Sequence, residues 1–267
     1  MENRDEHCRE LHERGIVKLE GLVSVEEAGV AREMIFDLAK EHEVFSGRRW
    51  MKSASRFGYP KPFRDALNRL NRTDRFPRPV GDRLVPLVEK LFGQPVTPLS
   101  PGQQILFSLP VDENWAVPSD AWHIDLPKMG EQASPGLQAF TFLEDAQPKG
   151  GAPLVIAGSH RLFNNSPGLS SRELKRKMRD EPYFQSLFDP GRPAIVHPET
   201  ATGCVHDVEL EVVELSGKVG DLYLMDLRVL HTPAQNGSDK ARMMLTGRFP
   251  RSTIAEGFGG ESIADAR

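Results

Sequence analysis

The chain has 267 residues, of which 39% are hydrophobic and 27% are charged, and its formal net charge is -4. This composition is ordinary for a folded globular protein, so it excludes the disordered and fibrous classes. The small negative charge gives no reason to expect nucleic acid or an anionic membrane as a partner. No apolar run approaches the roughly 20 residues of a membrane span, and the charged first residues do not resemble a secretory signal. We therefore expect a cytoplasmic protein with neither of these partners.

The first elements are expected to be scaffold. Residues 8–23 predict a short helix followed by a strand with one buried face. Ser24 and Glu27 then form a capping box, and apolar residues at helical spacing continue to about Glu43. This pattern predicts one long amphipathic helix.

Glycine and proline interrupt the hydrophobic pattern between residues 45 and 79, so this part is predicted to be mostly loop, with a short helix near 62–70. Another amphipathic helix is expected over residues 82–92. The segment from Arg48 to Arg83 carries eleven Lys or Arg against three acids. It is either a solvated surface or a loop over the mouth of a cavity, where it would attract an anionic substrate.

From Val96 onward the sequence consists of short apolar runs separated by turns. This spacing is typical of an antiparallel sandwich or barrel rather than of alternating strands and helices. The predicted strands span residues 104–109, 122–126, 138–143, 154–157, 209–215, 221–230 and 242–249.

One insert, at residues 162–203, interrupts the predicted strands and is expected to cover them as a lid. Its predicted helices span residues 170–178 and 183–188. We therefore predict a single domain over residues 1–267, with an N-terminal helical and loop part at 1–95 and a β core at 96–250.

His123 and Asp125 form a His-x-Asp pair in one predicted strand. Alternate residues of a strand project from the same face, so the two side chains leave room for one cation between them. An imidazole and a carboxylate suit a divalent transition metal, and His231 is the candidate third ligand. The alternative is a salt-bridged strand edge, because so short a pattern recurs by chance.

His231 follows an apolar strand face, so it is either a metal ligand or a satisfied core histidine. Arg242 opens the next predicted strand, eleven residues later, where a guanidinium can lie beside the metal site. A buried Arg is costly unless an anion meets it. Met244, Thr246 and Arg248 would share its face of the strand.

Five motifs occur along the chain in a specific order. They are Gly15–Gly21, Trp122–Asp125, Gly150–Arg161, Gly220–Asp221, and His231 followed by Arg242. In this order, and over most of the chain, the sequence resembles the phytanoyl-CoA dioxygenase-like branch of the iron(II)- and 2-oxoglutarate-dependent oxygenases.

The resemblance implies a mainly β fold with flanking helices, in which the β core is a double-stranded β-helix, or cupin-like jelly-roll barrel. It implies that His123, Asp125 and His231 bind Fe(II) and are the catalytic centre. It also implies that 2-oxoglutarate chelates the iron, that Arg242 pairs with its distal carboxylate, and that O2 takes a remaining position.

The sequence departs from the family pattern at two positions. Ala157 stands where the family usually has Pro, and Pro233 stands where some members place a hydroxyl that helps to hold the oxoacid. Thr232 and Thr246 are the candidates for that missing cosubstrate contact. His160, in the Gly-Ser-His turn, is expected to be structural.

Three residues are candidates for substrate binding: Gln104, Trp122 and Arg248. For Trp122 we favour a place in the barrel wall. Arg248 either faces the cavity, where it would suit an anionic small molecule, or pairs with an acid such as Glu256 at the strand end.

The expected reaction is hydroxylation of an aliphatic C–H bond of a small molecule, with decarboxylation of 2-oxoglutarate to succinate and CO2. Halogenating relatives carry a small residue at the position of Asp125, which argues against halogenation; desaturation and ring formation stay open. A zinc-dependent hydrolase would use the same triad but would leave Arg242 without a task. A non-catalytic jelly-roll binding protein is the third alternative.

Overall fold

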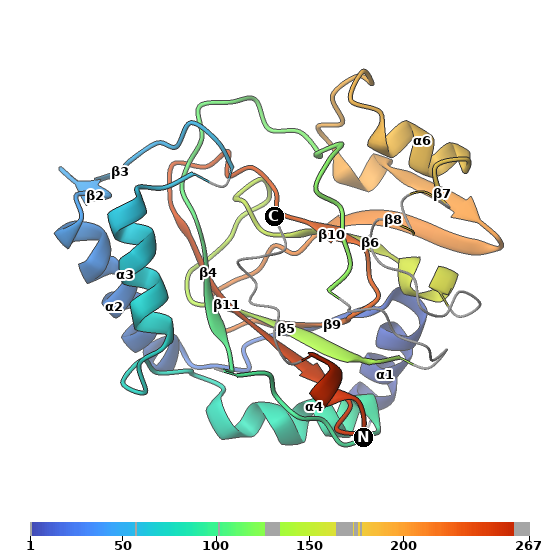
Figure 1. Cartoon of the computed structure of the whole chain (residues 1–267), viewed down its shortest axis with the longest axis horizontal. Coiled ribbons are helices and arrows are strands. Elements are labelled where there is room, and N and C mark those ends of the chain that lie inside the picture. The colour runs from blue at the N-terminus through green and yellow to red at the C-terminus, as the bar shows by residue number, and fades with distance from the viewer. Residues whose placement is uncertain are drawn as a thin grey trace.

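Two antiparallel β-sheets form the centre of the protein, with helices on either side (Figure 1). The structure is a computed structural model that describes residues 2–56, 58–100, 102–125, 134–163, 173, 176 and 178–258. Within this part of the chain, the larger sheet has the strand order β1-β9-β5-β11-β4 and the smaller sheet the order β10-β6-β8-β7. The predicted mainly β architecture is confirmed.

The strands of the larger sheet are β1 (Ile16–Leu19), β4 (Gln104–Ser108), β5 (Gly136–Phe142), β9 (Leu222–Asp226) and β11 (Arg242–Pro250). Those of the smaller sheet are β6 (Leu154–Ala157), β7 (Thr202–Val205), β8 (Val208–Glu214) and β10 (His231–Thr232). A short hairpin consists of β2 (Phe45–Ser46) and β3 (Arg49–Trp50).

The described α-helices are α1 (Glu2–Arg14), α2 (Val25–Glu41), α3 (Lys61–Asn71), α4 (Leu84–Phe92) and α6 (Pro182–Phe188). Short 3-10 helices occur at η1 (Gly81–Arg83), η2 (Ser159–Phe163), η3 (Pro198–Thr200) and η4 (Ala255–Phe258). None of these helices has the length and apolar character that a membrane crossing requires.

The predicted helix after residue 24 is confirmed as α2. The Ser24 hydroxyl accepts a hydrogen bond from the amide of Glu27 at 3.1 Å, and the Glu27 carboxylate accepts one from the amide of Ser24 at 3.0 Å. The predicted helices at 62–70 and 82–92 correspond to α3 and α4, and Gly93 ends α4 in the left-handed conformation that glycine tolerates best (φ 78°).

Strand alternation divides the larger sheet into two faces. On β5, Leu137 and Ala139 pack outward against the apolar faces of α1 to α4, which lie along one side of this sheet (Figure 1). Phe140 and Phe142 point the other way, into an interior cluster that also contains Met244 of β11 and Val155 of the smaller sheet. The interior between the sheets is therefore the space available for a site.

The insert covers the far side of the smaller sheet. Phe184 and Leu187 of α6 pack in one cluster with Leu154 and Ile156 of β6. The helix predicted at 183–188 is confirmed, and β7 adds the end of the insert to the smaller sheet. The helix predicted at 170–178 falls largely outside the described residues. The single-domain division stays a prediction.

The strand predicted over residues 122–126 is wrong as a strand. Among the described residues of this segment, only His123 forms a β-bridge, with His231. The alternation nevertheless persists, since Trp122 and Ile124 lie in the outer cluster while His123 and Asp125 face each other inside.

The strand predicted over 221–230 is shorter in the structure: only β9 (Leu222–Asp226) is a strand, and a corner separates it from β10, which begins at His231. β9 ends at Asp226, whose carboxylate accepts hydrogen bonds from the amide and the guanidinium of Arg228 at 2.8 and 3.0 Å. The chain thereby leaves the larger sheet and enters the smaller one at His231. The apolar pattern did not reveal this corner because Leu227 and Val229 are fully buried there.

Candidate metal centre

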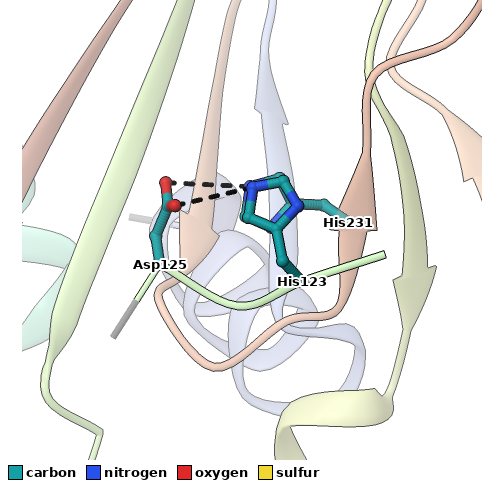
Figure 2. A group of neighbouring side chains, drawn as sticks. All are labelled: His123, Asp125 and His231. Atoms are coloured by element: carbon teal, nitrogen blue, oxygen red, sulfur yellow. Dashed lines mark ion pairs between the residues drawn. The ribbon is translucent and has the colours of Figure 1, made fainter. Parts of the chain in front are cut away.

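The three predicted metal ligands lie close together between the two sheets. Figure 2 shows the Asp125 carboxylate facing the imidazoles of both His123 and His231. The two imidazole Nε2 atoms each lie 3.7 Å from a carboxylate oxygen, Oδ1 for His123 and Oδ2 for His231. One ligand atom from each residue lies within 4.8 Å of the others, so a single ion can contact all three.

The backbone fixes the two histidines next to each other. The amide of His123 donates to the carbonyl of His231, and the amide of His231 donates to the carbonyl of His123, both at 2.9 Å. Each Nδ1 faces a main-chain carbonyl, that of Ala121 at 2.9 Å and that of Val229 at 3.1 Å. Because a carbonyl only accepts, Nδ1 carries the proton and Nε2 presents its lone pair to a metal.

The Gly-Ser-His turn supports this arrangement from outside the triad. The Ser159 hydroxyl accepts a hydrogen bond at 2.9 Å from the amide of Leu230, the residue before His231. His160 has Nε2 2.9 Å from the carbonyl of His12, and its ring packs so closely on Gly15 that a side chain there would clash. Its contacts place His160 in the scaffold.

The charges of the triad suit metal binding. Burial, with a further contribution from His123, lowers the pKa of His231 to about 4, so this imidazole is neutral at physiological pH. Burial opposes ionisation of the Asp125 carboxyl, yet its electrostatic interactions with the His231 imidazole and the Arg248 guanidinium outweigh burial and lower its pKa. His123 and a hydrogen bond from Gln138 act in the same direction.

Arg242 is a buried cation that meets neutral oxygens in the described structure. Its Nη1 donates to the carbonyl of Leu106 at 2.8 Å and its Nε to the hydroxyl of Ser108 at 3.3 Å. No carboxylate pairs with Arg242 among the described residues, and burial lowers its pKa to about 10. The positive charge of this guanidinium is therefore not neutralised by a carboxylate of the described structure, and an anion could pair with it.

Ser108 is a candidate site residue that the sequence analysis missed. It lies opposite Arg242 in the register between β4 and β11 and is buried. A serine has no signal of its own in a sequence, and only the pairing of two strands far apart in the chain brings it to the guanidinium.

Arg248 faces the interior and contacts the triad. It pairs with Asp125, Nε to Oδ2 at 3.1 Å, and not with Glu256 at the strand end. Thr246, two residues earlier on the same face of β11, accepts a hydrogen bond at 3.0 Å from Gln138 of β5. Gln104 is half-buried on β4, opposite Thr246.

Thr232 and Trp122 are engaged by the protein itself. The Thr232 hydroxyl donates to the carbonyl of Asp120 at 3.2 Å, which leaves Thr246 as the better-placed threonine for a cosubstrate. Trp122 is fully buried, with its indole N–H on the carbonyl of Pro118 at 2.9 Å and its ring against Phe188. It therefore lies in the wall.

The basic segment from Arg48 to Arg83 is not simply a loop over the mouth. The helix α3 within it packs against the outer face of the larger sheet through Phe63 and Leu67. Many of its cations have local partners. These are the pairs Lys52–Asp112, Arg56–Asp120, Lys61–Asp65 and Arg83–Glu27, and Arg78 with three main-chain carbonyls. An anionic substrate stays a prediction, and fewer unpaired cations of this segment are left to attract it.

Comparisons with known proteins agree with this geometry. The family model of phytanoyl-CoA dioxygenase (PhyH) matches residues 11–244. No curated protein matches the chain in sequence.

Several solved structures share the fold. SnoN, an epimerase crystallised with Fe3+, alpha ketoglutarate and nogalamycin RO, is 18% identical over 94% of this chain and 85% of its own, with a TM-score of 0.55. SnoK, a non-heme alpha ketoglutarate dependent carbocyclase from nogalamycin biosynthesis, is 18% identical over 92% and 83%, with a TM-score of 0.57. HygX from Streptomyces hygroscopicus, with nickel and 2-oxoglutarate bound, is 16% identical over 92% and 87%, with a TM-score of 0.51.

At these identities the similarity is one of fold, and it confirms the predicted jelly roll. The family follows from the match of the family model, which covers most of the sequence. The chain belongs to the phytanoyl-CoA dioxygenase family.

Proposed function

We propose that the protein is an Fe(II)- and 2-oxoglutarate-dependent oxygenase that hydroxylates an aliphatic C–H bond of a small molecule. The observation that carries the proposal is the combination, in one interior, of a His-Asp-His cluster and a buried arginine without an acid among the described residues. A zinc hydrolase would explain the first feature alone.

The triad fits iron by its donor set. Two imidazoles and one carboxylate form a three-ligand face, which leaves positions on the ion for an oxoacid and O2. No fourth His, Cys, Asp or Glu joins this group in the described structure, whereas a structural zinc site uses four protein ligands. When bound, the iron and the oxoacid would supply the oxidising chemistry.

Arg242 and its neighbours fit the distal carboxylate of 2-oxoglutarate. A planar guanidinium binds a carboxylate through two parallel hydrogen bonds, and burial strengthens the pair. The Ser108 hydroxyl accepts from Arg242 Nε, so its own proton is available to the same carboxylate. Thr246 lies on the same face of β11 and is the candidate for an additional contact.

The neighbours show why the reaction itself needs a test. Proteins of this fold include an epimerase and a carbocyclase, so the fold does not select hydroxylation. Asp125 supports hydroxylation over halogenation, because it occupies the place that a halide would need. The three outcomes differ in mass: hydroxylation adds one oxygen atom, cyclisation removes two hydrogens, and epimerisation changes neither.

Succinate formation from 2-oxoglutarate tests the proposal. The protein would be loaded anaerobically with Fe(II) or with Zn(II), titrated with 2-oxoglutarate by calorimetry, and then exposed to O2 with a panel of small acids, amino acids and natural-product scaffolds. We expect 2-oxoglutarate binding and succinate with Fe(II), and no succinate with Zn(II). Fe(II)-loaded protein that neither binds 2-oxoglutarate nor forms succinate would contradict the proposal.

A further inference from the structure

Asp125 reaches the metal site without support from a strand. His123, two residues earlier, is held by its backbone bridge to His231, but Asp125 takes part in no β-pairing among the described residues. A ligand carboxylate on an irregular segment needs another restraint if it is to keep one orientation.

Arg248, on the larger sheet, supplies such a restraint. Its Nε donates to Oδ2 of Asp125 at 3.1 Å, and the two side chains are only 12% and 6% exposed. Arg248 belongs to β11 in the larger sheet, whereas His231 belongs to β10 in the smaller sheet. The carboxylate is therefore tied across the interior.

The arginine is itself placed by the two strands at the middle of the larger sheet. Arg248 of β11 pairs in register with Gln138 of β5. The Gln138 amide donates to the Thr246 hydroxyl at 3.0 Å, and both side chains are buried. Gln138 and Thr246 are therefore buried neighbours of Arg248 on this sheet, and a hydrogen bond from Gln138 also reaches the Asp125 carboxylate.

The choice of Oδ2 as the oxygen that accepts from Arg248 matters for metal coordination. A carboxylate can bind a metal through one oxygen or through both, and a second bound oxygen would take a position that a chelating oxoacid and O2 require. A charged donor on Oδ2 favours the first mode. Both oxygens lie 3.7 Å from an imidazole Nε2, Oδ1 from that of His123 and Oδ2 from that of His231, so the distances alone do not separate them. The Arg248 hydrogen bond does, because it occupies Oδ2.

We propose that Arg248 is a positioning residue that holds Oδ2 of Asp125, so that the carboxylate presents Oδ1 alone to the metal. The inference rests on the proposed function only in that the triad must bind a divalent ion. It assigns Arg248 to the metal ligand rather than to an anionic substrate.

Metal affinity without cosubstrate or substrate tests the assignment. Wild type, Arg248→Met and Arg248→Lys would be titrated anaerobically with Co(II), by calorimetry and visible absorption. Loss of a ligand's outer hydrogen-bond partner typically weakens metal binding by about 10–100-fold, and we expect a loss of this order for Arg248→Met, with a changed Co(II) spectrum. Lys keeps the charge but lacks the Nε donor at this position, so the same change is expected. Wild-type behaviour of Arg248→Lys would overturn the hydrogen-bond assignment.

A second background shows whether Arg248 acts through Asp125. In an Asp125→Ala protein, Arg248→Met is expected to cause no further weakening of Co(II) binding; an equal loss in both backgrounds would overturn the proposal. Arg161→Met, which removes an arginine at an exposed position, is the control variant and is expected to leave the Co(II) spectrum unchanged. Circular dichroism would confirm that each variant is folded.

The two proposals fail differently. If wild type does not bind Co(II) or Fe(II), the proposed function is wrong and the role of Arg248 falls with it. If wild type binds the metal and Arg248→Met has the same affinity and spectrum, only the role of Arg248 is wrong.

Discussion

Two arginines on one strand face meet different partners. Arg242 ends among neutral oxygens, and Arg248 ends on a carboxylate of the triad. The sequence predicted that both would share a face of β11, and the register confirms it. The partners were not predictable, because they lie on segments more than 100 residues away from each arginine in the chain.

Replacing His123 or His231 with Ala is expected to abolish metal binding and turnover while the fold persists. Each imidazole provides one ligand, whereas the hydrogen bonds that join the two residues come from the backbone and survive the substitution. Iron content and circular dichroism would be measured together, with exposed His197→Ala as the matched control. Full iron content in either ligand variant would remove that histidine from the metal site.

Replacing Arg242 with Ala is expected to weaken 2-oxoglutarate binding by an amount on the order of 2–5 kcal/mol, because it leaves a buried carboxylate without its partner. Calorimetry on metal-loaded protein would measure the change, and Arg161→Ala, at an exposed position, is the control. Unchanged affinity for 2-oxoglutarate would show that a residue other than Arg242 binds its distal carboxylate.

At the scale of elements, local signals were reliable and corners were not. The capping box, the glycine that ends α4 and most strands were predictable because each depends on neighbours in sequence. The break between β9 and β10 was not, because its buried apolar residues continue the strand pattern. The family resemblance identified the three residues of the triad. That Asp125 lies on an irregular segment rather than on a strand could be seen only in the folded chain.

The short strand β10 depends on a hydroxyl from the neighbouring turn. Replacing Ser159 with Ala leaves the amide of Leu230 buried without its acceptor, so we expect the free energy of unfolding to fall by about 1–3 kcal/mol. Because this amide precedes His231, metal affinity is expected to fall as well. Urea unfolding and Co(II) titration would measure the two effects, with exposed Ser186→Ala as control. A variant as stable as the control would show that Ser159 does not hold this strand.

For the molecule as a whole, one half-buried carboxyl outside the site links stability to pH. Burial raises the pKa of Glu214 to about 7, although a hydrogen bond from the amide of Lys149 at 2.7 Å opposes the shift. In the unfolded chain the group would ionise near its ordinary value of 4.5. The folded state therefore binds more protons between these values, and stability is lost as pH rises from about 4.5 through about 7.

Replacing Glu214 with Gln is expected to remove this pH-dependent loss of stability. For the pKa shift of Glu214, the loss in the free energy of unfolding is roughly 3 kcal/mol. Unfolding by urea would be followed at pH values from about 4.5 to about 7.5 in metal-free protein. The wild type should become less stable relative to the variant across this range. Parallel pH profiles for the two proteins would show that another group controls the dependence.

The main-chain bridge between His123 and His231 has a consequence for which ions the protein can accept. Since two reciprocal backbone hydrogen bonds set the spacing of the imidazoles, that spacing cannot adjust easily to ions of different radius. Asp125 has no such bridge among the described residues and is held through its side chain by Arg248, which yields more easily than a main-chain bridge, so its side of the site absorbs more of any mismatch in size. Exchange of one divalent ion for another would then move the carboxylate and leave the histidine pair where it is.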